Sequence, residues 1–247
     1  MERIKLRKLK NIRDISYKNI KEKRLIRSES LFKLPKHDQK VLVEQYNLKV
    51  VIDLRTTQEH NDKKDVIIPG VTYYHLPLIT MEEMGAASEK EGKEKVIKNH
   101  VLPDIYDYYR RLCFPERKEA WTKIFDTLLN QEEGAILLHC TVGKDRSGIV
   151  AAIILLALGI DKETVYQDYL LTNEHPIIPF SYKIFALSLD KEFRKEFMEY
   201  FKAKEGYLDE AFRYIDETYG GLDNFLVEMC GITEYKQKRL KELYLAK

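Results

Sequence analysis

The chain has 247 residues, a length that fits one large domain with a substantial core. Its 42 basic and 40 acidic residues nearly cancel, which leaves a formal net charge of +2. Proteins dedicated to nucleic-acid binding usually carry a strong basic excess, so this balance argues against that class. Any function that depends on positive charge must therefore be local.

The three cysteines, Cys113, Cys140 and Cys230, lie far apart and form no CxxC pair. Such a sparse, odd set is typical of a reducing compartment and does not indicate a disulfide framework. The first 16 residues are basic but lack the apolar core of a secretory signal. The longest apolar run, residues 149–158, is shorter than the roughly 20 residues that span a bilayer. We expect a cytoplasmic protein without an integral membrane segment, with export by a signal-independent route left open.

The first part of the chain predicts strands that alternate with helices. Residues 24–34 begin as a short strand and end in a turn at Pro35, and residues 37–47 show apolar residues at helical spacing. The run LKVVIDLR, residues 48–55, is apolar without alternation, which is typical of a buried strand in a mostly parallel sheet. Residues 70–78 predict the next strand.

Residues 80–95 differ in composition, because they are polar, contain two glycines and show little periodicity. We expect either a solvated loop or a mobile lid over a site. Residues 102–112 and 117–130 then predict helices. After a break at Gly134, residues 135–140 predict a further strand.

The second part of the chain predicts mainly helices. Residues 147–158 are apolar almost all round and predict a buried helix, and Asp161 caps a predicted amphipathic helix. The sequence HPIIPF interrupts the pattern before several further helices. Strands alternating with helices, followed by a helical tail, predict an α/β fold with a central, mostly parallel sheet. We expect residues 1–247 to form one domain, with residues 176–247 as a helical elaboration.

The stretch HCTVGKDRSG, residues 139–148, joins the last predicted strand to the buried helix. This order places Cys140 at the carboxyl end of a strand, where open α/β sheets bind ligands. The amides of such a loop form an anion-binding nest, and the helix N-terminus adds positive potential that favours a thiolate. Gly143 permits backbone conformations closed to other residues. Arg146 offers a planar fork of donors that matches two phosphate oxygens.

Other kinds of loop fit these residues poorly. An ATP-type phosphate loop needs a glycine where Leu138 stands and a hydroxyl residue where Asp145 stands. A rhodanese-type sulfurtransferase loop usually places its arginine sooner after the cysteine. A zinc site fails because His139 and Cys140 are adjacent and no second pair of ligands is clustered in the sequence. We therefore expect no metal and no cofactor.

The stretch HCTVGKDRSG resembles the HC-x5-R-[ST] signature of the cysteine-dependent protein tyrosine phosphatases. Flanking segments are similar to the atypical bacterial and fungal branch related to the mycobacterial secreted tyrosine phosphatase B. The resemblance covers most of the chain and implies the cysteine-phosphatase fold. NIRDIS departs from the pattern of that branch, since it lacks the glycine pair. The flanking segments are NIRDIS (residues 11–16), IRSESL (26–31), VIDLR (51–55), DYLLTNE (168–174) and YGGLDNFLVEMCGI (219–232).

The resemblance implies a role for each residue of the loop. Cys140 would be the nucleophile that forms a phosphocysteine intermediate, and Arg146 would hold the phosphoryl oxygens during transfer. The hydroxyl of Ser147 would bond the thiolate, with helix capping as the structural alternative. His139 would order the loop by hydrogen bonding. The remaining phosphate donors would be the backbone amides of Thr141, Val142, Gly143, Lys144 and Asp145.

A general acid must protonate the departing oxygen, and two carboxyl groups are candidates. Asp145 lies in the loop, near the rim where a leaving group would sit; alternatively, it balances a neighbouring cation. Asp53 ends a strand at the same sheet edge; alternatively, it forms a structural ion pair with Arg55 or Arg13. We favour Asp145.

The sequence thus predicts a metal-independent hydrolase that acts on phosphotyrosine, with phosphoserine, phosphothreonine (dual specificity) or phosphoinositide as further substrates. Lys144 suits polyanionic ligands, although Asp145 offsets its charge. The expected partner is a phosphorylated protein or a phosphoinositide, and the oligomeric state stays open. Two alternatives remain: a small-molecule phosphatase of the inositol phosphate type, and a non-catalytic phosphate-binding module.

Overall fold

The computed structural model describes residues 2–17, 19–84, 94–96 and 98–246. Within them, six strands form one sheet in the order β1-β2-β3-β6-β4-β5. The strands are β1 (Glu2–Arg3), β2 (Arg13–Asp14), β3 (Leu25–Ser28), β4 (Leu48–Asp53), β5 (Thr72–His75) and β6 (Ala135–His139).

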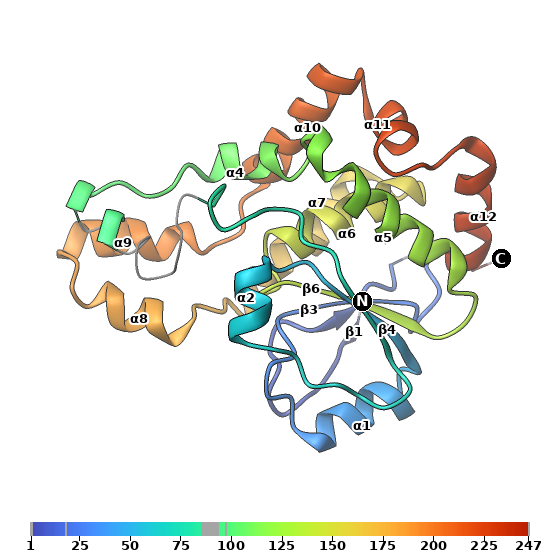
Figure 1. Ribbon diagram of the computed structural model, residues 1–247, viewed down its shortest axis with the longest axis horizontal. Coiled ribbons are helices and arrows are strands. Elements are labelled where there is room, and N and C mark those ends of the chain that lie inside the picture. Colours follow the sequence, from blue (N-terminus) through green and yellow to red (C-terminus); the bar gives the residue numbers. More distant parts are fainter. Residues whose placement is uncertain (1, 18, 85–93, 97, 247) are drawn as a thin grey trace.

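Helices account for most of the remaining described residues (Figure 1). They are α1 (Lys36–Glu44), α2 (Thr57–Asp62), α4 (Ile105–Arg111), α5 (Lys118–Asn130), α6 (Arg146–Ala157), α7 (Lys162–Leu170), α8 (Phe180–Ala186), α9 (Lys191–Tyr200), α10 (Glu205–Tyr219), α11 (Leu222–Glu228) and α12 (Glu234–Tyr244), with short 3-10 turns at Pro115–Arg117 and Leu171–Glu174. Among the described residues, no helix is long and apolar enough to cross a membrane.

The sheet is mostly parallel, as predicted. Strands β3, β6, β4 and β5 run parallel, and only the two short N-terminal strands pair antiparallel. The register pairs His139 at the end of β6 with Ser28 on one side and Asp53 on the other. The carboxyl ends of three neighbouring strands therefore meet beside Cys140.

Alternating side chains of the central strand divide the core into two layers. Ile136 and Leu138 face the larger cluster, which includes Trp121 and Phe125 of α5, and Leu137 faces the smaller cluster around Leu42 of α1. Figure 1 shows α1 on one side of the sheet and α5, α6 and α7 on the other. Because side chains of a strand alternate between faces, an apolar run without alternation needs this double cover.

Helix α6 supplies the foundation of the site. All of its residues except Leu156 are buried, as its all-round apolar sequence predicts. A helix packed on every side cannot tilt without opening voids in the core, so its N-terminus is held in a fixed place. That N-terminus directly follows the loop after Cys140.

Helices α8 and α9 form a separate small cluster with Val96, built on Phe185, Phe193 and Phe197. In Figure 1 they lie away from the sheet. The predicted helical tail is confirmed. The segment expected to be a loop or a lid, residues 80–95, lies mostly outside the described residues, because residues 85–93 are not among them.

Candidate active site

In the loop between β6 and α6, residues 140–145, side chains of Asn11 and Arg27 bind the carbonyl oxygens. The amide of Asn11 donates to the carbonyl of Val142 at 2.8 Å. Arg27 donates to the carbonyls of Gly143 at 3.1 Å and Lys144 at 2.8 Å. Among the described residues, the amides of residues 141–144 make no hydrogen bond. A loop whose carbonyls are fixed outward presents its amides to an anion, which is the nest expected from the sequence.

A buried ion-pair cluster fixes the residues that hold the loop. Asp168 of α7 accepts from Arg13 Nε and from Arg27 Nη1, both at 2.8 Å, and Arg13 also donates to Asn11 Oδ1 at 2.9 Å. Burial raises the pKa of Asp168, but the charges of the two arginines lower it more, to about 2. The segments NIRDIS, IRSESL and DYLLTNE therefore meet behind the loop, which gives these similarities a physical reason.

Two glycines allow this close packing. Gly143 has a φ of +75°, and a Cβ there would lie 2.8 Å from the carbonyl of Ser28. A Cβ on Gly148 would lie 2.9 Å from Arg27 Nη2. Any larger residue at either position would push the loop or its supporting arginine out of place.

Cys140 lies at the floor of the loop, with only 1% of its surface exposed. Its Sγ is 3.6 Å from the hydroxyl of Ser147, which stands in the first turn of α6. The hydroxyl and the positive end of a twelve-residue helix both stabilise negative charge on sulfur. The expected hydroxyl–thiol contact is thus present in the structure.

Arg146 is held by a carboxylate that the sequence did not single out. Its Nη1 and Nη2 donate to the two oxygens of Glu59 at 2.5 and 3.0 Å. Burial raises the pKa of Glu59, but Arg146 lowers it more, to about 2. Thr141 also donates its hydroxyl to Glu59. Among the described residues, the buried Nε of Arg146 has no partner, which leaves a donor for a phosphoryl oxygen.

A local sequence signal positions Glu59. Helix α2 begins with a capping box, in which Glu59 N donates to Thr56 Oγ1 at 3.2 Å and Thr56 N donates to Glu59 Oε2 at 2.9 Å. The pattern T-x-x-E directly after VIDLR predicts such a helix start. Helix α2 was not predicted from the sequence, although this motif indicates both the start of the helix and the place of Glu59 in it.

Asp145 lies directly before α6, and 18% of its side chain is exposed. Its Oδ1 accepts from the hydroxyl of Tyr109 at 2.8 Å and lies 3.3 Å from Lys144 Nζ. The carboxyl is therefore partly balanced by a cation, as the structural alternative expected, and its side chain stays partly exposed.

Asp53 is bound to Arg55 through both oxygens, at 2.9 and 2.7 Å, and its Oδ2 also lies 2.9 Å from His60 Nδ1. Burial raises the pKa of Asp53, but the hydrogen bonds and charges of Arg55, His139 and His60 lower it further, below its usual range. Such a carboxylate holds no proton to donate at neutral pH. The geometry favours the structural alternative, with Arg55 as the partner, over an acid role for Asp53.

Lys144 contributes its backbone to the loop, but its ammonium points elsewhere. Its Nζ donates to the carbonyls of Tyr200 at 3.0 Å and Lys202 at 3.5 Å, and lies 5.6 Å from the ring centre of Tyr207. The side chain is buried. Its charge ties the loop to α9 and α10, and the structure does not direct it toward the nest.

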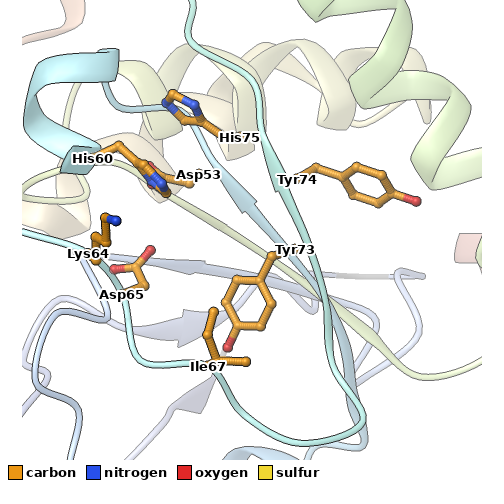
Figure 2. Close-up of a pocket in the computed structure, with 8 residues that line it drawn as sticks. All are labelled: Asp53, His60, Lys64, Asp65, Ile67, Tyr73, Tyr74 and His75. Atoms are coloured by element: carbon orange, nitrogen blue, oxygen red, sulfur yellow. The ribbon is translucent and has the colours of Figure 1, made fainter.

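His139 is fully buried and lies between the loop and a carboxylate. Its Nδ1 is 3.2 Å from the carbonyl of Cys140, and its Nε2 is 2.9 Å from Asp65 Oδ2. This placement agrees with a loop-ordering role. Beside it, a cavity of about 140 Å³ is lined by acidic, histidine and tyrosine side chains (Figure 2).

Residues of metal-ligand type gather around this cavity: Asp53, His60 and His75 form one group. Arg55 already bridges the carboxylates of Asp53 and Asp65, at 2.7 and 3.0 Å, and His75 Nε2 lies 2.9 Å from its carbonyl. The guanidinium supplies the positive charge that these groups need. The cluster thus supports the strand ends on which Cys140 depends.

Comparison with known proteins gives consistent results. Residues 4–246 match the family described as the tyrosine phosphatase family. The chain is 29% identical over 173 residues to the triple specificity protein phosphatase PtpB of Mycobacterium tuberculosis, covering 65% of this chain and 62% of that protein. It is 26% identical over 150 residues to a tyrosine-protein phosphatase of Nostoc commune, covering 61% and 48%.

The alignments thus span about half to three fifths of the length of these curated relatives. Among solved structures, PTPMT1 in complex with PI(5)P is 15% identical, with 77% of this chain and 99% of that chain covered and a TM-score of 0.39. The family match extends over nearly the whole sequence and includes the loop that follows Cys140. This chain therefore belongs to the tyrosine phosphatase family.

Proposed function

We propose that this chain is a cysteine-dependent phosphatase, a phosphoric monoester hydrolase that acts on phosphotyrosine through a phosphocysteine intermediate. One arrangement carries the proposal. The thiol of Cys140 lies at the floor of a loop whose carbonyls are fixed outward by Asn11 and Arg27, against the N-terminus of α6. Arg146 stands beside it, with a buried Nε that none of the described residues pairs with.

The first step transfers the phosphoryl group to sulfur. The thiolate of Cys140 attacks phosphorus while the bond from phosphorus to the phenolic oxygen breaks. The loop amides and Arg146 stabilise the charge on the equatorial oxygens. Asp145 donates a proton to the departing oxygen, so the product leaves as a neutral phenol.

The second step returns the enzyme to its starting state. A water molecule attacks phosphorus, its proton passes to the carboxylate of Asp145, and the bond from phosphorus to sulfur breaks. The Ser147 hydroxyl, 3.6 Å from sulfur, stabilises the thiolate that departs. Inorganic phosphate is released, and all protons are accounted for without a metal or cofactor.

The placement of the Lys144 ammonium bears on the class of substrate. The charge argument for polyanionic ligands used the ammonium of Lys144, which is buried against Tyr200 and Tyr207. That placement removes the charge argument for phosphoinositides as further substrates beside phosphotyrosine. One relative is described as a triple specificity protein phosphatase, so the test includes an ester other than phosphotyrosine.

The test measures phosphate release from an aryl phosphate, a phosphotyrosine peptide and a phosphoinositide, each with EDTA present. Wild type is compared with Cys140→Ser and with Cys113→Ala, a matched control at a buried cysteine outside the loop. We expect turnover that survives EDTA and is retained in Cys113→Ala but is absent in Cys140→Ser.

Two results would contradict the proposal. Loss of turnover on adding EDTA would indicate a metal-dependent reaction. A wild-type protein that binds inorganic phosphate but releases none from any ester would indicate a phosphate-recognition module. The order of the three substrates tests the preference for phosphotyrosine separately.

A further inference from the structure

Two tyrosine side chains join the proposed general acid, Asp145, to the core of the protein. The hydroxyl of Tyr109 on α4 donates to Oδ1 of Asp145 at 2.8 Å. The same hydroxyl lies 2.5 Å from the hydroxyl of Tyr169 on α7. Because the Tyr109 hydroxyl donates its hydrogen bond to the carboxyl, it accepts a hydrogen bond from the hydroxyl of Tyr169. A chain of hydrogen bonds thus runs from α7 through α4 to the loop.

Both phenols are fixed in place. Tyr109 and Tyr169 are each at most 1% exposed, and their rings pack edge to face with centres 6.4 Å apart. Burial, with smaller contributions from nearby charges, raises the pKa of both hydroxyls well above the usual value. The phenols therefore remain proton donors throughout the neutral range.

The donors all meet one oxygen of the carboxyl. Lys144 Nζ lies 3.3 Å from the same Oδ1 that accepts from Tyr109. Among the described residues, the side-chain hydrogen bond to this carboxyl and its shortest ion-pair contact both involve Oδ1. An oxygen that faces an ammonium and a phenolic proton is a poor place for a third proton. When Asp145 is protonated, Oδ2 therefore holds the proton.

We propose that Tyr109 is a positioning residue for the general acid: by occupying Oδ1 of Asp145, it assigns the transferable proton to Oδ2 and holds that oxygen toward the leaving group. The inference rests on the proposed function, because it concerns the acid of that reaction. Proton transfer requires the donor atom within hydrogen-bond reach of the leaving oxygen. A carboxyl free to rotate would meet this condition only part of the time.

The test compares two esters that differ in their need for an acid. Phenyl phosphate releases a basic phenoxide, whereas 4-nitrophenyl phosphate releases a stable anion. Tyr109→Phe retains the buried ring and removes only the hydroxyl. We expect kcat for phenyl phosphate to fall about tenfold, a part of the 10²–10⁴-fold that acid–base catalysis supplies. We expect kcat for 4-nitrophenyl phosphate to change less than about twofold, with KM unchanged for both.

A double-mutant comparison separates this role from a structural one. In the Asp145→Asn background, Tyr109→Phe should cause no further loss on phenyl phosphate, because the group it positions is gone. Tyr106→Phe is the matched control, since Tyr106 lies on the same helix with an exposed side chain. Thermal unfolding of each variant checks that the fold is retained.

The possible outcomes separate the role of Tyr109 from the proposed function. An equal loss on both esters, or an added loss in the Asp145→Asn background, would overturn the role of Tyr109 while leaving the proposed function intact. A wild-type protein inert toward both esters would overturn the proposed function, and the role of Tyr109 with it. A loss confined to phenyl phosphate, absent in the Asp145→Asn background, is the result that we expect.

Discussion

Two aspartates at the same edge of the sheet differ in how their oxygens are bound. Asp53 accepts from Arg55 through both oxygens and from His60 as well. Among the described residues, Asp145 has one side-chain hydrogen bond, from Tyr109 to Oδ1, and keeps part of its surface exposed. Residue type and place in the fold are therefore insufficient to identify an acid. The number and charge of the donors on each oxygen decide whether a carboxyl can hold a proton and give it away.

The largest expected effect comes from Asp145→Asn. The amide cannot donate an acidic proton, so kcat for phenyl phosphate should fall by roughly 10²–10⁴-fold. The loss on 4-nitrophenyl phosphate should be much smaller. Steady-state kinetics with both esters measures the difference, and a uniform loss would mean that Asp145 is not the acid.

Asp53→Asn should affect stability more than the proton-transfer step. The change leaves the buried guanidinium of Arg55 without its strongest partner, and breaking such a pair costs about 3 kcal/mol. Urea unfolding measures the free energy of unfolding directly. Any remaining activity should keep the wild-type ratio between the two esters. A ratio that shifts against phenyl phosphate would return Asp53 to the list of candidate acids.

The ion pair of Asp53 with Arg55 leads to a prediction about the pH dependence of stability. The folded-state pKa of Asp53 lies below its unfolded value of roughly 3.9, so its contribution to stability is complete above that value. The contribution is lost as the pH falls below about 4. The decline of the unfolding free energy as the pH falls from about 4 toward about 2 should therefore be shallower in Asp53→Asn than in wild type. Parallel declines would contradict the assigned ion pair.

The smallest effect is expected from Glu59→Gln, which replaces the ion pair with Arg146 by a weaker hydrogen bond and leaves the arginine in place. Hydrogen bonds to charged groups contribute roughly 1.5–3 kcal/mol, so kcat/KM should fall about tenfold. The loss should be equal for the two esters, because Arg146 acts on the phosphoryl group that both share. A loss that depends on the leaving group would show that Glu59 acts on proton transfer instead.

Much of this molecule follows from local patterns. The apolar run of residues 48–55 predicts a buried strand, and the all-round apolar segment after the loop predicts the buried helix α6; both are confirmed. The loop between β6 and α6 follows from its glycine, arginine and cysteine. These features depend on neighbours within one segment, which the sequence displays directly.

The rest depends on contacts between distant segments. Glu59 reaches Arg146 across 87 positions, and Tyr109 reaches Asp145 across 36. The direction of the Lys144 ammonium depends on where α9 ends, 56 positions away. Spacing along the chain holds no information about such pairs. The resemblance to a family indicated the loop that holds Lys144, Asp145 and Arg146, but the partners of these residues needed the fold.

The most direct measurement is capture of the covalent intermediate. Wild-type protein is mixed with an aryl phosphate, quenched in acid within the first turnover, digested and analysed by mass spectrometry. We predict the added mass of one phosphoryl group on the peptide that contains Cys140, and none in Cys140→Ser. Full turnover with the phosphoryl group on another residue, or with no adduct at all, would contradict the mechanism.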